Sequence, residues 1–317
     1  MPRKALFLVN PAAGKRQSRE PLFDAAAVLS QAGYLLNIHL TSGRGDATET
    51  ARREGADYDL VLCSGGDGTL NETITGLMDL PSPPPLGYLP RGSTNDFAAS
   101  LGIPAQPAEA AEAILRSQGR TLDIGRWNER CFAYVACFGA FTRTSYSAPQ
   151  EAKNILGHFA YILEGVKDLS SLRPYRVRLT ADGEALDGDY LFGAVCNSTS
   201  LGGLMKLGRD EVIMDDGKFE MLLVRNPRTI LELQGILTAL LNQNYHHEDL
   251  IFRHISTLTA EPAGELPWSL DGEYAPSAET VTIRNCVAEE GVVIGYDGTQ
   301  SHIGSFAGRF NGTIENC

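Results

Sequence analysis

The feature that most constrains the fold is a regular alternation of apolar and helix-forming segments in the first third of the chain. Segments with helical spacing and helix-end signals lie at 19–31, 46–54 and 69–78. Apolar runs of strand length lie at 5–9, 34–40, 58–63 and 86–89. Strands and helices in this order predict a parallel sheet with helices on both faces, that is, an α/β domain.

The pattern changes after about Asp123. Short runs rich in β-branched and aromatic residues follow, separated by turn signals such as Asp182-Gly183. These runs lie at 131–138, 176–180, 190–195, 219–224, 255–259 and 280–283, with helical segments at 153–169 and 229–241. The sequence therefore predicts an α/β domain at 1–123 and a mostly antiparallel β domain at 124–296. The tail at 297–317 has a Gly-, Ser- and Asn-rich composition, which suggests partial disorder.

Charge and apolar content limit the classes of function. Lys plus Arg is 27 and Asp plus Glu is 39, so the formal net charge is 27 − 39 = −12. This balance makes the chain a poor candidate for nucleic-acid binding and disfavours permanent docking on anionic lipid, but it allows transient docking through a local patch. No run reaches the roughly 18–20 apolar residues of a membrane span. The six cysteines form no C-x-x-C pair, so we expect buried thiols and a cytoplasmic protein.

The strongest chemical signal is a glycine-rich turn between an apolar strand and a helix. It reads Ser64-Gly65-Gly66-Asp67-Gly68-Thr69-Leu70-Asn71-Glu72. Glycines let the backbone approach a ligand closely, and the N–H groups at a helix N-terminus favour an anion. Asp67 is suited to hold a hydrated Mg²⁺ beside that anion. A plain turn with an Asp cap is the simpler alternative, but it needs neither two successive glycines nor a third.

Two further segments carry candidate site residues. Thr94, Asn95 and Asp96 follow the strand at 86–89, and three capping-type residues in a row exceed the needs of one helix cap. The carboxyl ends of parallel strands meet at one sheet edge, so we expect this loop, the glycine-rich turn and the loop at 10–15 to converge. Much later, Trp268–Tyr274 contains Asp271-Gly272, which on its own indicates a hairpin turn.

Together these segments resemble the diacylglycerol kinase catalytic superfamily, which includes bacterial diacylglycerol kinases, sphingosine kinases and ceramide kinases. The resemblance rests on residues 65–72, 92–98, 215–217 and 270–273, and it extends in unbroken order from about Leu6 to Ile294. It implies an ATP-binding α/β domain, a β-sandwich domain, Mg²⁺, and diacylglycerol or a similar lipid reached transiently at a membrane surface. The sequence departs from many relatives at Gly92-Ser93-Thr94, where these have Gly-Thr-Gly or Gly-Thr-Ala.

The resemblance also implies roles for individual residues. It implies nucleotide contacts for Thr41, Gly65, Gly66, Asp67, Gly68, Thr69, Leu70, Asn71, Thr94 and Asn95, with a looser match for Lys15 as a phosphate contact. Asp67 and Asp96 are candidate metal ligands beside the phosphates, and Asp216 with the carbonyls of Ile213 and Lys218 resembles a structural metal site. Asp271 resembles the general base. Glu273 lies two residues on, so in an extended strand it would share the face of Asp271 and hold a metal or orient the base.

Two other functions are compatible with these motifs. A kinase for a soluble substrate, such as NAD kinase, shares the Gly-Gly-Asp-Gly turn, although the segments at 92–98 and 270–273 favour the lipid branch. A non-catalytic nucleotide or lipid sensor would have little reason to keep Asp67, Asp96, Asp271 and Glu273 together. The sequence does not decide the acceptor or the oligomeric state, for which a homodimer is one alternative.

Overall fold

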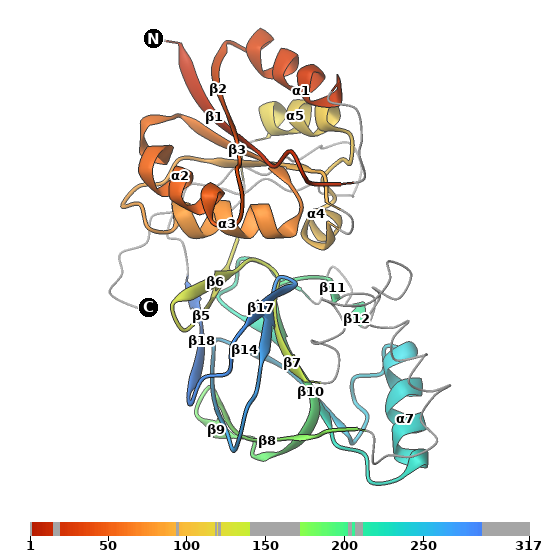
Figure 1. Ribbon diagram of the computed structural model, residues 1–317. Helices are drawn as coiled ribbons and strands as arrows, with labels where there is room; N and C mark the ends of the chain where they lie inside the picture. Colours follow the sequence, from red (N-terminus) through yellow and green to blue (C-terminus); the bar gives the residue numbers. More distant parts are fainter. Residues whose placement is uncertain are drawn as a thin grey trace. The chain divides into compact units, whose positions relative to one another are not determined.

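The computed structural model describes residues 2–14, 20–92, 95–117, 119, 122–139, 172–201, 205–206 and 212–286. Lys15, Thr94, the expected helix at 153–169 and the expected tail at 297–317 lie outside these residues. The chain divides into two compact units (Figure 1). One comprises Met1–Asp123 with Cys286–Cys317, and the other comprises Ile124–Asn285. No helix in the described ranges is long and apolar enough to cross a membrane.

The first unit is an α/β domain with a four-stranded parallel sheet, as the alternating pattern predicts. The strands run in the order β2-β1-β3-β4. The elements are β1 (Arg3–Val9), α1 (Glu20–Gln31), β2 (Tyr34–Leu40), α2 (Asp46–Glu54), the short 3-10 helix η1 (Gly55–Asp57), β3 (Leu60–Gly65), α3 (Asp67–Leu77), β4 (Leu86–Pro90), α4 (Asp96–Leu101) and α5 (Pro107–Arg116). The third strand begins and ends two residues later than expected, and the following helix starts two residues earlier, at Asp67 rather than Thr69.

The central strands are apolar because both of their faces are covered. Every residue of β3 and β4 is buried, whereas the edge strand β2 is largely exposed. Helices α1 and α5 pack together, as do α2 and α3 (Figure 1). From β1, the chain first adds β2 on one side and then β3 and β4 on the other, so the strand order reverses between β1 and β3. In open α/β sheets ligands bind at the carboxyl ends of the strands at such a reversal.

The second unit is built on a twelve-stranded sheet in which every recorded strand pair is antiparallel. Its strands are β5 (Ile124–Trp127), β6 (Arg130–Phe132), β7 (Val135–Gly139), β8 (Tyr175–Ala181), β9 (Glu184–Ala185), β10 (Gly188–Cys196), β13 (Phe219–Arg225), β14 (Leu250–Ile255), β15 (Thr257–Pro262), β16 (Trp268–Leu270), β17 (Glu273–Ala275) and β18 (Val281–Cys286). The unit also contains α7 (Ile230–Leu241) and a small pair of strands, β11 (Ser200–Leu201) and β12 (Met205–Lys206). The runs expected at 131–138 and 255–259 each contain a break, which divides them between two strands.

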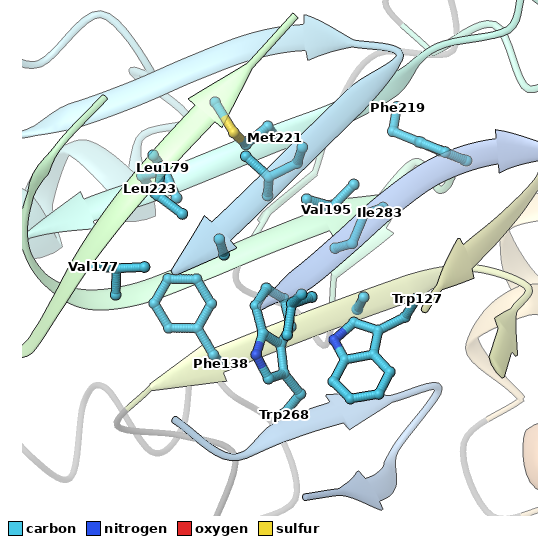
Figure 2. Close-up of a cluster of buried hydrophobic side chains, with 14 of the residues drawn as sticks. Trp127, Phe138, Val177, Leu179, Val195, Phe219, Met221, Leu223, Trp268 and Ile283 are labelled. Carbon is cyan, nitrogen blue, oxygen red and sulfur yellow. The ribbon is translucent and has the colours of Figure 1, made fainter. Parts of the chain in front are cut away.

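One buried apolar cluster holds this second unit together (Figure 2). Trp268 of β16 belongs to this cluster, with its ring centroid 4.9 Å from that of Phe138 and 6.3 Å from that of Trp127. Trp268 and Leu270 are each only 1% exposed, so β16 is fixed along its length. The turn that follows β16 therefore starts from a rigid position.

Candidate functional site

The turn between β3 and α3 presents a helix N-terminus without a side-chain cap. Its N-cap residue, Gly66, is extended and has no side chain to cap the helix. Asp67 is the first residue of the helix and is 9% exposed. Its Oδ2 accepts a hydrogen bond from the N–H of Asp96, at 3.2 Å, which links this turn to the start of α4. The carboxylate thus lies where two helices of the unit begin.

Close backbone contact between the loops explains why glycines occupy them. A Cβ added to Gly92 would lie 2.6 Å from the Cα of Gly66, and one added to Gly66 would lie 3.1 Å from the Cα of Gly92. At Gly14, where φ is +80°, an added Cβ would lie 2.6 Å from the carbonyl oxygen of Arg91. The loops after β1, β3 and β4 therefore meet through their backbones, and the expected convergence is confirmed.

Asn10, at the end of β1, joins the first two of these loops. Its Nδ2 donates to Thr69 Oγ1 at 2.9 Å, and its own N–H donates to the Ser64 carbonyl at 2.9 Å. Its Oδ1 accepts from the N–H of Ala12, also at 2.9 Å. At the next strand end, Thr41 donates its N–H to the Val9 carbonyl. The Asn10-Pro11 pair indicated the end of a strand and one of the converging loops, but the contacts of the Asn10 side chain were not predicted.

Two other residues of these motifs shape the loops. Asn95 has a left-handed backbone, with φ of 52°, and its amide bonds both the N–H and the carbonyl of Gly92, at 2.7 and 3.0 Å. Glu72 accepts a hydrogen bond from Gly45 N–H at 2.9 Å and thereby holds the loop that leads into α2. The side chain of Leu70 is fully buried and its N–H bonds the Gly66 carbonyl, so Leu70 supports the fold of the motif by packing within the unit.

Burial and hydrogen bonding shift the pKa values of ionisable groups near the carboxyl ends of the parallel strands. Burial raises the pKa of the Asp96 carboxyl above its ordinary value. Hydrogen bonds from the Ser42 N–H and hydroxyl lower the pKa of Asp46. Burial also raises the pKa of the Cys63 thiol to about 12, so this cysteine stays neutral and is no nucleophile. The expectation of buried thiols is confirmed for Cys63, Cys131, Cys137 and Cys196.

The second candidate site lies in the hairpin between β16 and β17. Leu270 pairs with Glu273, and the two residues between them, Asp271 and Gly272, have φ values of 49° and 83°. Positive φ at both central residues is the geometry of a type I′ turn. The predicted Asp-Gly turn is confirmed. The expectation that Glu273 shares the strand face of Asp271 is wrong, because Asp271 belongs to the turn and not to a strand.

The carboxylate of Asp271 is held by backbone amides from a distant segment. Its Oδ2 accepts from Ala133 N–H at 2.6 Å, and its Oδ1 accepts from Tyr134 N–H at 3.0 Å and Val135 N–H at 2.9 Å. The residue is 4% exposed, and its own N–H donates to the Val135 carbonyl. Such donors fix the orientation of a carboxylate and stabilise its ionised form. Sequence reasoning missed these contacts because more than 130 residues separate the partners.

The Asp216 segment forms a solvent-exposed turn. Asp216 Oδ1 accepts a hydrogen bond from Lys218 N–H at 3.0 Å, and the intervening Gly217 has φ of +78°. Ile213, just before the turn, is 52% exposed. Among the described residues, no three or more His, Cys, Asp and Glu side chains are grouped to hold a metal ion. A metal at this turn would therefore depend largely on backbone carbonyl oxygens.

Comparison with known proteins gives the family. Residues 4–127 match the model for the diacylglycerol kinase catalytic domain, and residues 139–288 match that for the YegS C-terminal NAD kinase beta sandwich-like domain. The diacylglycerol kinase of Bacillus subtilis (strain 168) is 32% identical over 274 residues, which cover 86% of this chain and 90% of that protein. The chain belongs to the diacylglycerol kinase family. As a member, it is an ATP-dependent kinase of the diacylglycerol kinase type.

Further members of the diacylglycerol kinase family support this assignment. The diacylglycerol kinase of Staphylococcus aureus (strain bovine RF122 / ET3-1) is 34% identical over 276 residues, covering 86% of this chain and 87% of its own. A crystal structure of a diacylglycerol kinase from Bacillus anthracis str. Sterne superposes with a TM-score of 0.71 at 26% identity, covering 89% of this chain and 94% of that one. The similarity thus includes both the parallel α/β domain and the antiparallel domain.

Proposed function

We propose that this kinase transfers the γ-phosphoryl group of ATP to a lipid hydroxyl, with diacylglycerol as the acceptor and phosphatidic acid as the product. The observation that supports this most directly is the contact between Gly66 and Gly92, with Asp67 at the start of α3 beside it. The names of the relatives supply the acceptor.

The α3 N-terminus is suited to the phosphates of ATP. Backbone N–H groups at an uncapped helix start attract anions, and the helix dipole adds to this attraction. Glycines on both sides leave the backbone uncovered by side chains, so a phosphate would meet N–H groups directly. In this proposal Gly65–Asn71, Thr41 and Asn95 form the nucleotide site. Lys15 and Thr94 belong to it by resemblance and stay predictions.

Asp67 and Asp96 would hold Mg²⁺. Two carboxylates are a sufficient protein contribution, because Mg²⁺ retains several waters and takes its other ligands from the substrate phosphates. The hydrogen bond from Asp96 N–H to Asp67 Oδ2 supports this proposal, because it places the two residues next to each other. When bound, Mg²⁺ neutralises negative charge on the phosphates. We further propose that Asp216, the carbonyls of Ile213 and Lys218, and Glu273 form a second, structural metal site.

Asp271 is our candidate for the general base. A lipid hydroxyl attacks phosphorus more readily if a positioned carboxylate accepts its proton as the new P–O bond forms. The three N–H donors hold the Asp271 carboxylate in one orientation, which suits this role. Glu273, at the start of β17, would support the second metal site or orient the base.

An acceptor panel with labelled ATP and Mg²⁺ tests the proposal. We expect phosphate transfer to diacylglycerol in mixed micelles and none to NAD, with Asp67→Ala as the inactive control. Transfer to NAD but to no lipid would identify a soluble-substrate kinase. If ATP binds but no acceptor in the panel is phosphorylated, the chain would instead be a sensor.

A further inference from the structure

The outer face of α7 in the second unit carries apolar residues and no charge. Ile230, Leu231 and Leu241 are 46%, 78% and 55% exposed, and the other exposed residues of the helix are Gln234 and Thr238. At 100° per residue, all five fall within an arc of about 100° on the helix surface. The opposite side is buried and contains Leu233, Ile236, Leu237, Ala239 and Leu240. The helix therefore packs on its unit through one face and presents a second apolar face outward.

The single charged residue of α7, Glu232, is engaged in local hydrogen bonds, and such bonds also fix both ends of the helix. Glu232 accepts a hydrogen bond from the Arg228 N–H at 2.6 Å, and its own N–H donates to the hydroxyl of the N-cap residue Thr229 at 3.1 Å, a variant of the capping box in which the glutamate bonds the residue before the cap. At the other end, Gln243 is left-handed, and Asn244 N–H donates to the Ala239 carbonyl. Solvent-facing sides of surface helices ordinarily carry charges. Both ends of α7 are capped by hydrogen bonds, yet its exposed side contains no charged residue.

Two cations precede this apolar face. Arg225 and Arg228 are exposed, and neither forms an ion pair with any residue in the described ranges. Other arginines of the same unit are paired, for example Arg178 with Glu261 and Arg253 with Glu184. In a chain with a net charge of −12, unpaired arginines beside exposed leucines form a local exception. Asp249 lies beside Arg225, whose N–H donates to the Asp249 carbonyl at 2.9 Å, but the Asp249 carboxylate pairs with His247, at 3.8 Å, and with neither arginine.

We propose that α7 docks the protein on an anionic phospholipid surface. Leu231 and Leu241 would enter the boundary of the acyl chains, with Arg225 and Arg228 against headgroup phosphates. A twelve-residue helix is about 18 Å long, so it can lie in the interface plane but cannot span the bilayer. Exposed apolar side chains together with unpaired cations match the acyl chains and the anionic headgroups of such a surface. The inference rests on the proposed lipid kinase function, because a lipid acceptor must be reached at a membrane.

Vesicle flotation without ATP or acceptor tests the docking. The wild type should float with phosphatidylcholine–phosphatidylglycerol vesicles much more than with phosphatidylcholine alone. Leu231→Gln should lower the partition coefficient about tenfold. Arg225→Gln and Arg228→Gln should each lower it about fivefold, on anionic vesicles only.

Matched controls lie in the first unit. Phe23→Gln removes an apolar side chain that is 70% exposed on α1, and Arg53→Gln removes one positive charge from the surface. Neither should change flotation. If the controls reduce binding as much as the α7 variants, or if the α7 variants bind like the wild type, the docking proposal is wrong. If the α7 variants change the oligomeric state measured by sedimentation but not the flotation, this face is a contact between two copies of the chain. That result would also overturn the docking proposal.

A water-soluble, short-chain diacylglycerol separates this proposal from the proposed function. The α7 variants should phosphorylate the monomeric lipid as fast as the wild type and lose activity only on vesicles. If the wild type phosphorylates no lipid but floats through α7, the acceptor assignment fails and the docking stands. If lipid is phosphorylated and the α7 variants keep full activity on vesicles, the docking fails and the kinase assignment stands.

Discussion

Replacing Asp271 by asparagine should both slow phosphoryl transfer and destabilise the second unit. Asparagine keeps the size of the side chain and tolerates the left-handed φ of 49°. In the better amide orientation its oxygen still accepts from Tyr134 and Val135, but its NH₂ group then faces the Ala133 N–H, at the position where Oδ2 now lies 2.6 Å away. One charge-assisted hydrogen bond is lost and a buried donor is left unpaired, so the free energy of unfolding should fall by about 2–4 kcal/mol.

The same substitution removes the proposed proton acceptor. A positioned general base typically contributes roughly 10²- to 10⁴-fold to the rate, so kcat should fall within that range while the Kd for ATP changes little. Stability is measured by urea denaturation, and kcat is expressed per folded molecule at a temperature below the unfolding transition. The two effects are then independent readouts.

Asp182→Asn is a matched control in the same unit. Asp182-Gly183 forms the same two-residue turn, with φ values of 45° and 84°, and its carboxylate accepts from the Ser256 and Thr257 N–H groups. Because Asp182 is exposed, its replacement should cost less stability and leave kcat unchanged. If Asp271→Asn matches the wild type in kcat per folded molecule, Asp271 only anchors the segment at 133–135. If its stability is unchanged, the hydrogen-bond argument fails.

Three further substitutions test the first unit. Asp67→Ala should lower turnover at least ~10²-fold and weaken Mg-ATP binding while the fold survives, measured by kinetics, calorimetry and circular dichroism. Gly92→Ala should push the backbone of Gly66 away, weaken ATP binding and cost ~1–3 kcal/mol of stability, whereas Gly43→Ala, with nothing within 4 Å, should do neither. Asp46→Asn should lower stability at neutral pH. Because folding lowers the pKa of Asp46, that difference should shrink in urea titrations as the pH falls below the ordinary value of 3.8; a constant difference contradicts this.

The strands and helices of the first unit were predictable because their signals are local. A strand buried on both faces must be apolar along its whole length, and β3 and β4 are. The position of the glycine-rich turn follows from the same pattern, since it comes directly after β3. What the pattern could not give is the partner of each glycine: Gly66 needs no side chain because Gly92 lies against it, and the two are separated by a helix and a strand.

The second unit was less predictable because its order depends on pairing between distant strands. A break such as the one at Ala133 and Tyr134 within an apolar run leaves no mark in composition, although it supplies two of the N–H donors to Asp271. The division of the run at 255–259 was missed for a similar reason. Ser256 separates β14 from β15, and its N–H bonds Asp182 instead of a neighbouring strand.

The two Asp-Gly turns show where sequence reasoning on residues alone reaches its limit. Asp182-Gly183 and Asp271-Gly272 have the same dipeptide, the same left-handed backbone and carboxylates that accept backbone N–H groups. The two turns differ in their surroundings. Asp182 is exposed, whereas Asp271 is only 4% exposed and directly follows a strand that is fixed by the packing of Trp268. A buried carboxylate stays ionised only if hydrogen-bond donors surround it, and these donors also fix its position. Local sequence could not separate the two turns, so the choice of Asp271 as base came from the family resemblance, and its burial gives that choice a physical reason.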